Sequence, residues 1–309
     1  MHWFWFALAA PALFALSNQI DKFLLHHKVE KDTHSVARLI IYSSFIGMIA
    51  TPIILLFGVE PFAGISGLQI AIMTLVGIFG MTSLWFYFHA LEKDDASIVT
   101  TLYQTIPVIQ LILGYFFLSE QLSRMQLVGF FVILIGAVLI LLDTTALRAK
   151  KIQIKKGIIF MMLASSVMYA LSSLLYKWVV IDSVFGAAMF WEYIGATLFG
   201  LALCAVSPVY RREVRAIFRV ENHTLLLFNF FNELLTVIGM LSIRYASIFV
   251  PVALATIIGG IQPVFVVLYG WIFTKFAPKF ITENITRDHM IQKAAAVVVI
   301  IIGIVIISV

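Results

Sequence analysis

Long apolar runs place the strongest limit on what this chain can fold into. Ten stretches carry almost no charge, and each is close to the roughly 20 residues that a helix needs to cross a bilayer. Lipid cannot bond to backbone N–H and C=O groups, so a run that crosses it must pair these groups internally. Apolar residues make up 62% of the chain and charged residues 12%, which excludes a water-soluble fold. The sequence predicts an all-α integral membrane protein with ten transmembrane helices, at 3–25, 35–58, 67–90, 96–118, 125–143, 157–180, 184–207, 223–245, 250–274 and 290–308.

The second half of the chain repeats the first with a nearly constant offset. The matching pairs, 155 or 156 residues apart, are Ser17 and Ser172, Lys22 and Lys177, Thr100 and Thr256, and Pro107 and Pro263. Each copy holds five spans, an odd number, so the second copy must enter the membrane with the opposite orientation. The sequence therefore predicts two inverted five-helix repeats, 1–145 and 157–309, joined by a basic linker at 146–156.

Basic residues gather on one side of the predicted spans. The loops after the odd-numbered spans, with the adjoining span ends, hold seventeen Lys and Arg residues, whereas the opposite side holds only Arg124 and Arg244. Positive charge stays in the cytoplasm, so this pattern predicts a multi-pass plasma membrane protein with both termini outside. The net charge of +5 thus reports orientation and indicates no nucleic-acid partner.

A series of motifs runs from Ala90 to Leu142. It consists of Ala90-Leu91, Ala96-Ser97, Pro107-Val108, Glu120, Gly129 and Gly136, and a weaker copy runs from Ala246 through Gln262-Pro263-Val264-Phe265 and Glu283 to Gly303. This pattern resembles the EamA domain of the drug/metabolite transporter superfamily. The resemblance implies ten helices, a central cavity lined by spans 1–4 and 6–9, peripheral spans 5 and 10, and alternating access for small metabolites or drugs.

The chain departs from that family in two respects. Ser119 stands before the glutamate where the family usually has glycine. Family members also generally keep both termini in the cytoplasm, opposite to the orientation that the loop charges predict.

Glu233 is an acid about eleven residues into an apolar span, where burying a charge costs roughly 3 kcal/mol. It shares one helix face with Asn229, Asn232 and Thr236, because these residues follow i, i+3, i+4, i+7 spacing. A polar stripe against lipid is costly, so we expect this face to point inward. Two interpretations stay open: a carboxylate that binds a cationic group or a proton, and a structural acid that is protonated or paired with lysine.

Glu192 stands among aromatic residues in span 7, next to Trp191. An acid beside aromatic rings suits an organic cation, through charge pairing and cation–π attraction. The alternative is a residue of the aromatic belt at the membrane interface.

Spans 4 and 9 carry matching polar or small residues ahead of a proline. Proline frees a backbone carbonyl, and a span tolerates this only beside protein or a wet cavity. The pattern predicts cavity-lining helices, and tight helix packing through small residues is the alternative. The residues are Thr100, Tyr103, Gln104 and Pro107 in span 4, and Thr256, Gly259, Gly260 and Pro263 in span 9.

Two lysines occupy equivalent positions in spans 1 and 6. Lys22 shares a helix face with Asn18 and Asp21, and Lys177 shares one with Tyr169. Inversion places the two lysines near opposite membrane surfaces, so they are candidates for an inner and an outer gate. The alternative is that both lysines extend to the membrane interface.

No pattern in the chain indicates an enzyme. The one cysteine, Cys204, permits no intrachain disulfide, and the histidines at 26, 27 and 34 have no carboxylate pair at ligand spacing. Glu120 and Glu283 stand at helix ends, where we expect them to cap or anchor loops. No metal, cofactor, catalytic group or nucleotide-binding motif is predicted.

The favoured function is a secondary carrier for a small polar or cationic metabolite, such as an amine, an amino acid or a quaternary ammonium compound. Without a nucleotide site, its energy would come from protons or from substrate exchange. The alternative function is a flippase for a lipid or a lipid-linked headgroup on the same scaffold. The expected partners are the small-molecule substrate, protons and the lipid bilayer, with homodimer formation left open.

Overall fold

A computed structural model describes residues 2–27, 35–93, 99, 102–141, 156–217, 223–276 and 287–308, and these residues form helices and no strand. Six of the described helical segments are long and apolar enough to cross a membrane: His2–Ile20, Val36–Leu56, Gly67–Leu91, Lys156–Val180, Phe185–Val206 and Val252–Gly270. Three shorter apolar helices are Thr105–Leu118, Arg124–Leu139 and Ala295–Ile307. The chain is an all-helical membrane protein, as predicted, while the count of ten spans stays a prediction.

The described helices pack into two compact units, and each unit is treated by itself. The first unit comprises Met1–Glu30, Gly114–Ile154 and Thr224–Val309. Its helices are α1 (His2–His27), the end of α6 (Thr105–Leu118), α7 (Arg124–Leu141), α12 (His223–Phe249), α13 (Val252–Ile257), the 3-10 helix η1 (Ile258–Ile261), α14 (Gln262–Phe276) and α15 (Arg287–Ser308).

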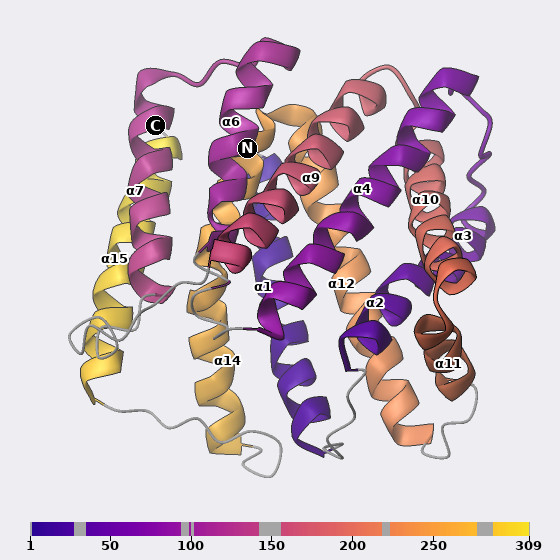
Figure 1. The fold of residues 1–309 in the computed structure, drawn as a ribbon. Helices are drawn as coiled ribbons and strands as arrows, with labels where there is room; N and C mark the ends of the chain where they lie inside the picture. The colour runs from indigo at the N-terminus through magenta and orange to yellow at the C-terminus, as the bar shows by residue number, and fades with distance from the viewer. Residues whose placement is uncertain are drawn as a thin grey trace. The chain divides into compact units, whose positions relative to one another are not determined.

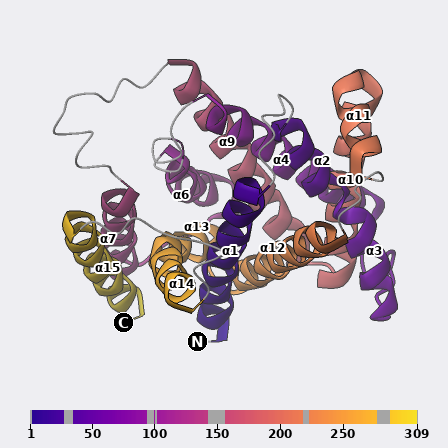
Figure 2. The ribbon, with the colours of Figure 1, turned by 90° about the horizontal axis from the view of Figure 1, so that it is seen from below.

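In this first unit, α7 lies side by side with α15, and α1 lies beside α14 (Figures 1 and 2). Glycine brings the backbones of α7 and α15 into contact. A Cβ added to Gly129 would lie 2.7 Å from the carbonyl oxygen of Gly303, which is too close for any side chain. Spans 5 and 10 therefore associate through backbone packing, the usual substitute for a hydrophobic driving force between helices in lipid.

The second unit comprises Lys31–Leu113 and Lys155–His223. Its helices are α2 (Ser35–Phe45), α3 (Gly47–Leu56), α4 (Gly67–Leu91), most of α6, α9 (Lys156–Val180), α10 (Phe185–Val206) and α11 (Pro208–Ile217). Helix α4 contacts both α9 and α10 (Figure 1). Gly77 of α4 faces the carbonyl of Glu192, and Gly195 of α10 faces the carbonyl of Thr74, so these two backbones also touch.

Each unit combines helices from both halves of the sequence. The first takes spans 1 and 5 from the N-terminal half and spans 8 to 10 from the C-terminal half. Packing units and sequence repeats are therefore different divisions of this chain, because helices of one copy pack against helices of the other. The repeat boundaries at 145 and 157 stay a prediction.

Two helices begin with a capping box, which fixes where they start. The Ser66 hydroxyl accepts from the Gln69 N–H at 3.3 Å, and the Gln69 side chain accepts from the Ser66 N–H at 2.8 Å. Ser123 and Gln126 form the same reciprocal pair at the start of α7, at 3.2 and 2.9 Å. Such pairs satisfy two of the four N–H groups that a helix start leaves without partners. Both starts lie within one residue of the predicted spans.

Candidate functional site

Spans 4 and 9 are both interrupted immediately before their proline. In span 4, Gln104 forms a turn and α6 begins at Thr105, two residues before Pro107. In span 9, the helix changes to the 3-10 geometry of η1 and resumes with α14 at Gln262, one residue before Pro263. Proline lacks an N–H, and its ring crowds the carbonyl four residues earlier, so continuous helix is disfavoured at both places. The two interruptions occur at positions that the sequence offset makes equivalent.

Hydroxyl groups from three helices meet at the span 4 interruption. Thr105 Oγ1 lies 2.8 Å from the carbonyl oxygen of Leu102 and 2.8 Å from Oγ of Ser166 in α9. Ser83 of α4 and Ser165 of α9 have their Oγ atoms 3.0 Å apart, and the Ser165 hydroxyl donates to the Ser83 carbonyl at 2.8 Å. The three serines are buried. Groups able to bind a polar ligand are therefore concentrated where the backbone is irregular.

Three tyrosine rings belong to the same cluster. The Tyr103 ring centroid lies 5.1 Å from that of Tyr87 and 6.3 Å from that of Tyr169. Tyr103 also hydrogen-bonds to Ser83. Tyr103 and Tyr169 were predicted from the sequence, whereas Tyr87 and Ser83 were missed. The only signal for these two was their four-residue spacing, which places them on one face of α4. Aromatic faces with hydroxyl groups can hold a cation and bond to polar groups.

Helix α1 is tied to α12 and α14 by two polar contacts inside the first unit. The hydroxyl oxygens of Ser17 and Thr236 lie 3.2 Å apart. Nε2 of Gln19 donates to the carbonyl oxygen of Val266 at 3.0 Å, and the Gln19 side chain is fully buried. The sequence analysis did not single out Gln19. Asn18, which it did select, is exposed.

The predicted polar stripe on α12 is described in part. Asn232 is buried, and its carbonyl accepts a hydrogen bond from the Thr236 hydroxyl at 3.1 Å. Because Thr236 contacts α1, this part of the stripe faces protein, as expected. Glu233 is half-buried on the same helix, and the side chain of Asn229 lies outside the described residues.

The two glycines of η1 have different surroundings. A Cβ on Gly260 would lie 3.0 Å from Ile133 and 3.3 Å from Ala137, both in α7, so Gly260 allows close helix packing. A Cβ on Gly259 would meet no atom within 4 Å. Gly259 therefore borders open space, which suits a cavity wall, whereas Gly260 fits the alternative of tight packing.

The N-terminal part of the chain matches the model of a known protein family. Residues 2–142 match the model of the EamA-like transporter family. Over these residues, a little under half of the chain, the sequence is similar to that family. The family is one of membrane transporters.

A likeness to a solved structure extends over nearly the whole chain. One solved crystal structure, described only as that of a protein, matches with a TM-score of 0.67 and 15% sequence identity, covering 97% of this chain and 94% of its own. At that identity the likeness shows a shared fold alone. No curated protein sequence matches the chain.

Trp191 and Glu192 of α10 lie at the α4–α10 contact of the second unit. The Trp191 ring donates from Nε1 to the Pro61 carbonyl at 2.8 Å and packs edge-on against Phe62, with centroids 5.5 Å apart. These contacts anchor the indole to the loop before α4 and fit the aromatic-belt alternative. Oε2 of Glu192 is buried.

The gate candidates are only partly described. Lys177 of α9 is buried, with 7% of its surface exposed, so its side chain is packed among protein groups. Pro107 is also buried. Thr100 and the side chains of Asp21, Lys22 and Pro263 lie outside the described residues.

Glu120 anchors the start of span 9. Its carboxylate oxygens accept from the N–H of Val252, the first residue of α13, at 3.0 and 3.2 Å. Its own N–H donates to the Gly114 carbonyl at 3.0 Å, after Ser119 adopts a left-handed conformation with φ 54°. The predicted anchoring role is confirmed for Glu120, and Glu283 lies outside the described residues. The left-handed backbone explains why the family favours glycine where this chain has Ser119.

No metal site emerges from the described ranges: no three His, Cys, Asp or Glu side chains there lie close enough together to hold an ion.

Proposed function

We propose that this protein is a secondary active transporter that moves a small polar or cationic metabolite by alternating access, driven by protons or by exchange. The observation that carries the proposal is the pair of helix interruptions before Pro107 and Pro263. Interrupted helices at equivalent positions of two repeats form the substrate and ion sites of many carriers, because unwound backbone offers carbonyl and N–H groups inside the membrane.

Equivalent contacts in the two units support two inverted repeats of five spans each. Ser17 of α1 bonds to α12 in the first unit. Its counterpart Ser172 of α9 donates to the carbonyl of Val76 in α4, at 3.0 Å, in the second unit. In the proposed ten-span numbering these contacts join spans 1 and 8, and spans 6 and 3, which inversion relates to each other. Lys22 and Lys177 would then be equivalent gate residues.

The chemistry of the cluster around Tyr103 supports the substrate class. Tyr87, Tyr103 and Tyr169 offer ring faces for a cation, and Ser83 and Ser166 offer hydroxyl groups for its polar substituents. Glu192, in the same unit as this cluster, is the predicted acid for a cationic substrate, and we assign the exchange of the coupling proton to Glu233 of the first unit. Such an acid is expensive within a span and is usually functional.

A ligand screen on the purified protein tests the proposal. Amines, amino acids, quaternary ammonium compounds, nucleotides and lipid headgroups are compared by thermal shift, and hits are then tested for uptake into proteoliposomes with and without a pH gradient. A ligand at 100 times its Kd stabilises the folded state by about 2.7 kcal/mol. If only a lipid stabilises the protein and is transported, the carrier proposal is wrong and the flippase alternative is supported.

The matched variants are Tyr103→Leu and Tyr115→Leu. Tyr103 directly precedes the interruption, whereas Tyr115 lies in α6 about three turns beyond it and is 56% exposed. Loss of a ring face over a desolvated cation should weaken binding by about 2 kcal/mol in Tyr103→Leu. Tyr115→Leu should bind as wild type. If both variants bind the ligand equally well, the tyrosine cluster is not part of the substrate site.

A further inference from the structure

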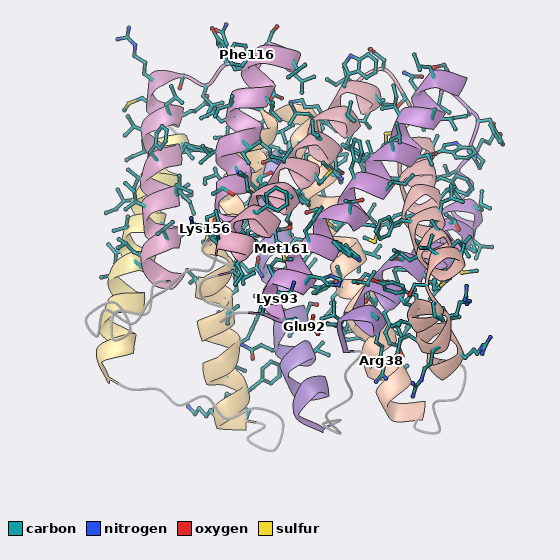
Figure 3. The ribbon with its side chains drawn as sticks, viewed as in Figure 1. Arg38, Glu92, Lys93, Phe116, Lys156 and Met161 are labelled. Carbon is teal, nitrogen blue, oxygen red and sulfur yellow. The ribbon has the colours of Figure 1, made fainter. Side chains whose placement is uncertain are left out.

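One face of the short helix α11, which follows span 7, packs against other helices of the second unit. The buried carboxylate of Glu213 lies 2.8 Å from Nε of Arg38 in α2, which is labelled in Figure 3. The Tyr210 hydroxyl accepts from Nε1 of Trp85 in α4 at 3.0 Å. Glu213 is only 2% exposed, so the orientation of α11 about its own axis is fixed. Helix α11 occupies Pro208–Ile217, in the connection between the predicted spans 184–207 and 223–245.

The opposite face of α11 is a stripe of three exposed arginines: Arg211, Arg212 and Arg215. At about 100° per residue they fall within a sector of roughly 100°, centred opposite Tyr210 and Glu213. Within the part of the chain that the structure describes, no acidic side chain forms an ion pair with Arg212 or Arg215.

Arg211 places this stripe at the end of a membrane span. Its guanidinium donates to the carbonyls of Cys204 and Ala205 at 2.9 and 3.1 Å, in the last turn of α10. Helix α10 ends at Val206 and α11 begins at Pro208, so Arg212 and Arg215 follow the end of the span by six and nine residues. Residues this close to the end of a membrane span are in reach of the lipid headgroups and their phosphates.

We propose that Arg212 and Arg215 bind the phosphates of anionic phospholipids and so fix α11 on the bilayer surface. Guanidinium groups bond to phosphate through two parallel N–H donors, which gives geometry as well as attraction. Each basic residue beside an anionic surface changes affinity about fivefold, so the pair should contribute about 25-fold. Since α2, α4 and α10 all contact α11, the lipid contact would reach three helices of this unit.

The test uses the purified full chain in neutral detergent micelles, titrated with micellar phosphatidylglycerol or phosphatidylcholine and followed by thermophoresis. Wild type should prefer phosphatidylglycerol, and this preference should fall as salt rises. The double variant Arg212→Gln/Arg215→Gln should lose the preference about 25-fold, and Arg212→Lys/Arg215→Lys should retain a large part of it.

Arg124→Gln is the control, because Arg124 is an exposed arginine at the start of α7. This variant should behave as wild type. Unchanged phosphatidylglycerol affinity in the glutamine double variant would overturn the proposal. The proposal would also be overturned if Arg124→Gln lost as much phosphatidylglycerol affinity as the double variant, or if this affinity did not depend on salt. Competition by free inorganic phosphate as strong as that by phosphatidylglycerol would overturn it too. Retained helix content by circular dichroism, expected for exposed positions, shows that a loss of affinity is not a loss of folding.

Discussion

Removing the Glu120 carboxylate should detach the start of span 9. The carboxylate accepts from the Val252 N–H at the N-terminus of α13, where a negative charge is also favoured by the helix dipole. Hydrogen bonds to charged groups are worth about 1.5–3 kcal/mol, and the half-buried position keeps this one partly shielded from water. Glu120→Ala should therefore lower the free energy of unfolding by about 2 kcal/mol. Glu120→Gln keeps an acceptor and should lose about 1 kcal/mol.

Gly114 provides a second perturbation that depends on the first. A Cβ there would lie 2.6 Å from Oε2 of Glu120, so in Gly114→Ala the carboxylate must shift, which weakens its bond to Val252. Alone, this substitution should be destabilising. In the Glu120→Ala background the obstruction is gone, and alanine should stabilise α6 by about 0.5–1 kcal/mol because glycine is the weaker helix former. The two substitutions should thus show a coupling energy and a change of sign.

Unfolding in mixed detergent and SDS micelles, followed by circular dichroism, measures all four proteins. The reasoning fails if Glu120→Ala unfolds at the wild-type SDS fraction. It also fails if Gly114→Ala changes the free energy of unfolding equally in both backgrounds.

Four further outcomes can be checked. Ser119→Gly should raise the free energy of unfolding by about 1 kcal/mol, since it relieves a left-handed residue at φ 54°, and a lower stability in the same SDS titration would contradict this. Gly303→Ala should lower the free energy of unfolding by about 1–3 kcal/mol, because the added Cβ separates α7 from α15. Gly157→Ala should not lower it measurably, because a Cβ added there meets no described atom within 4 Å. Glu233→Gln should abolish gradient-driven accumulation in proteoliposomes while ligand binding persists, and a wild-type rate and pH profile would make Glu233 a structural acid. A C-terminal fusion to alkaline phosphatase should be active and one to a fluorescent protein should be dark, because the C-terminus is predicted to lie outside the cytoplasm. An inactive phosphatase fusion and a fluorescent protein fusion that fluoresces would instead support the usual family orientation.

The helix positions could be predicted because membrane spans depend on composition and length, which are local properties. Span 3 was expected at 67–90 and α4 occupies Gly67–Leu91. The prolines at 107 and 263 indicated irregular backbone, but their presence did not reveal the 3-10 turn of η1 or the turn at Gln104, because those depend on how neighbouring helices satisfy freed groups.

Long-range polar partners could not be predicted in the same way. Gln19 stands in the sequence beside other polar residues, Ser17 and Asn18, and only the packed structure shows that its amide reaches the Val266 carbonyl in α14. Ser83 and Tyr87 were missed for the same reason, since their partners are far away in the chain. The packing units were equally hidden, because each combines helices from both halves of the sequence.

The capping boxes at Ser66 and Ser123 have a consequence for bilayers of different thickness. If a thicker membrane buries the start of a helix in its hydrocarbon core, the first N–H groups lose their hydrogen bonds to water. An N-cap residue replaces one of these bonds and so recovers about 1 kcal/mol of free energy. Here each start carries two acceptors of its own, from the hydroxyl and amide side chains. When the membrane thickens, hydrophobic mismatch at the first turns of α4 and α7 therefore costs less than at an uncapped start.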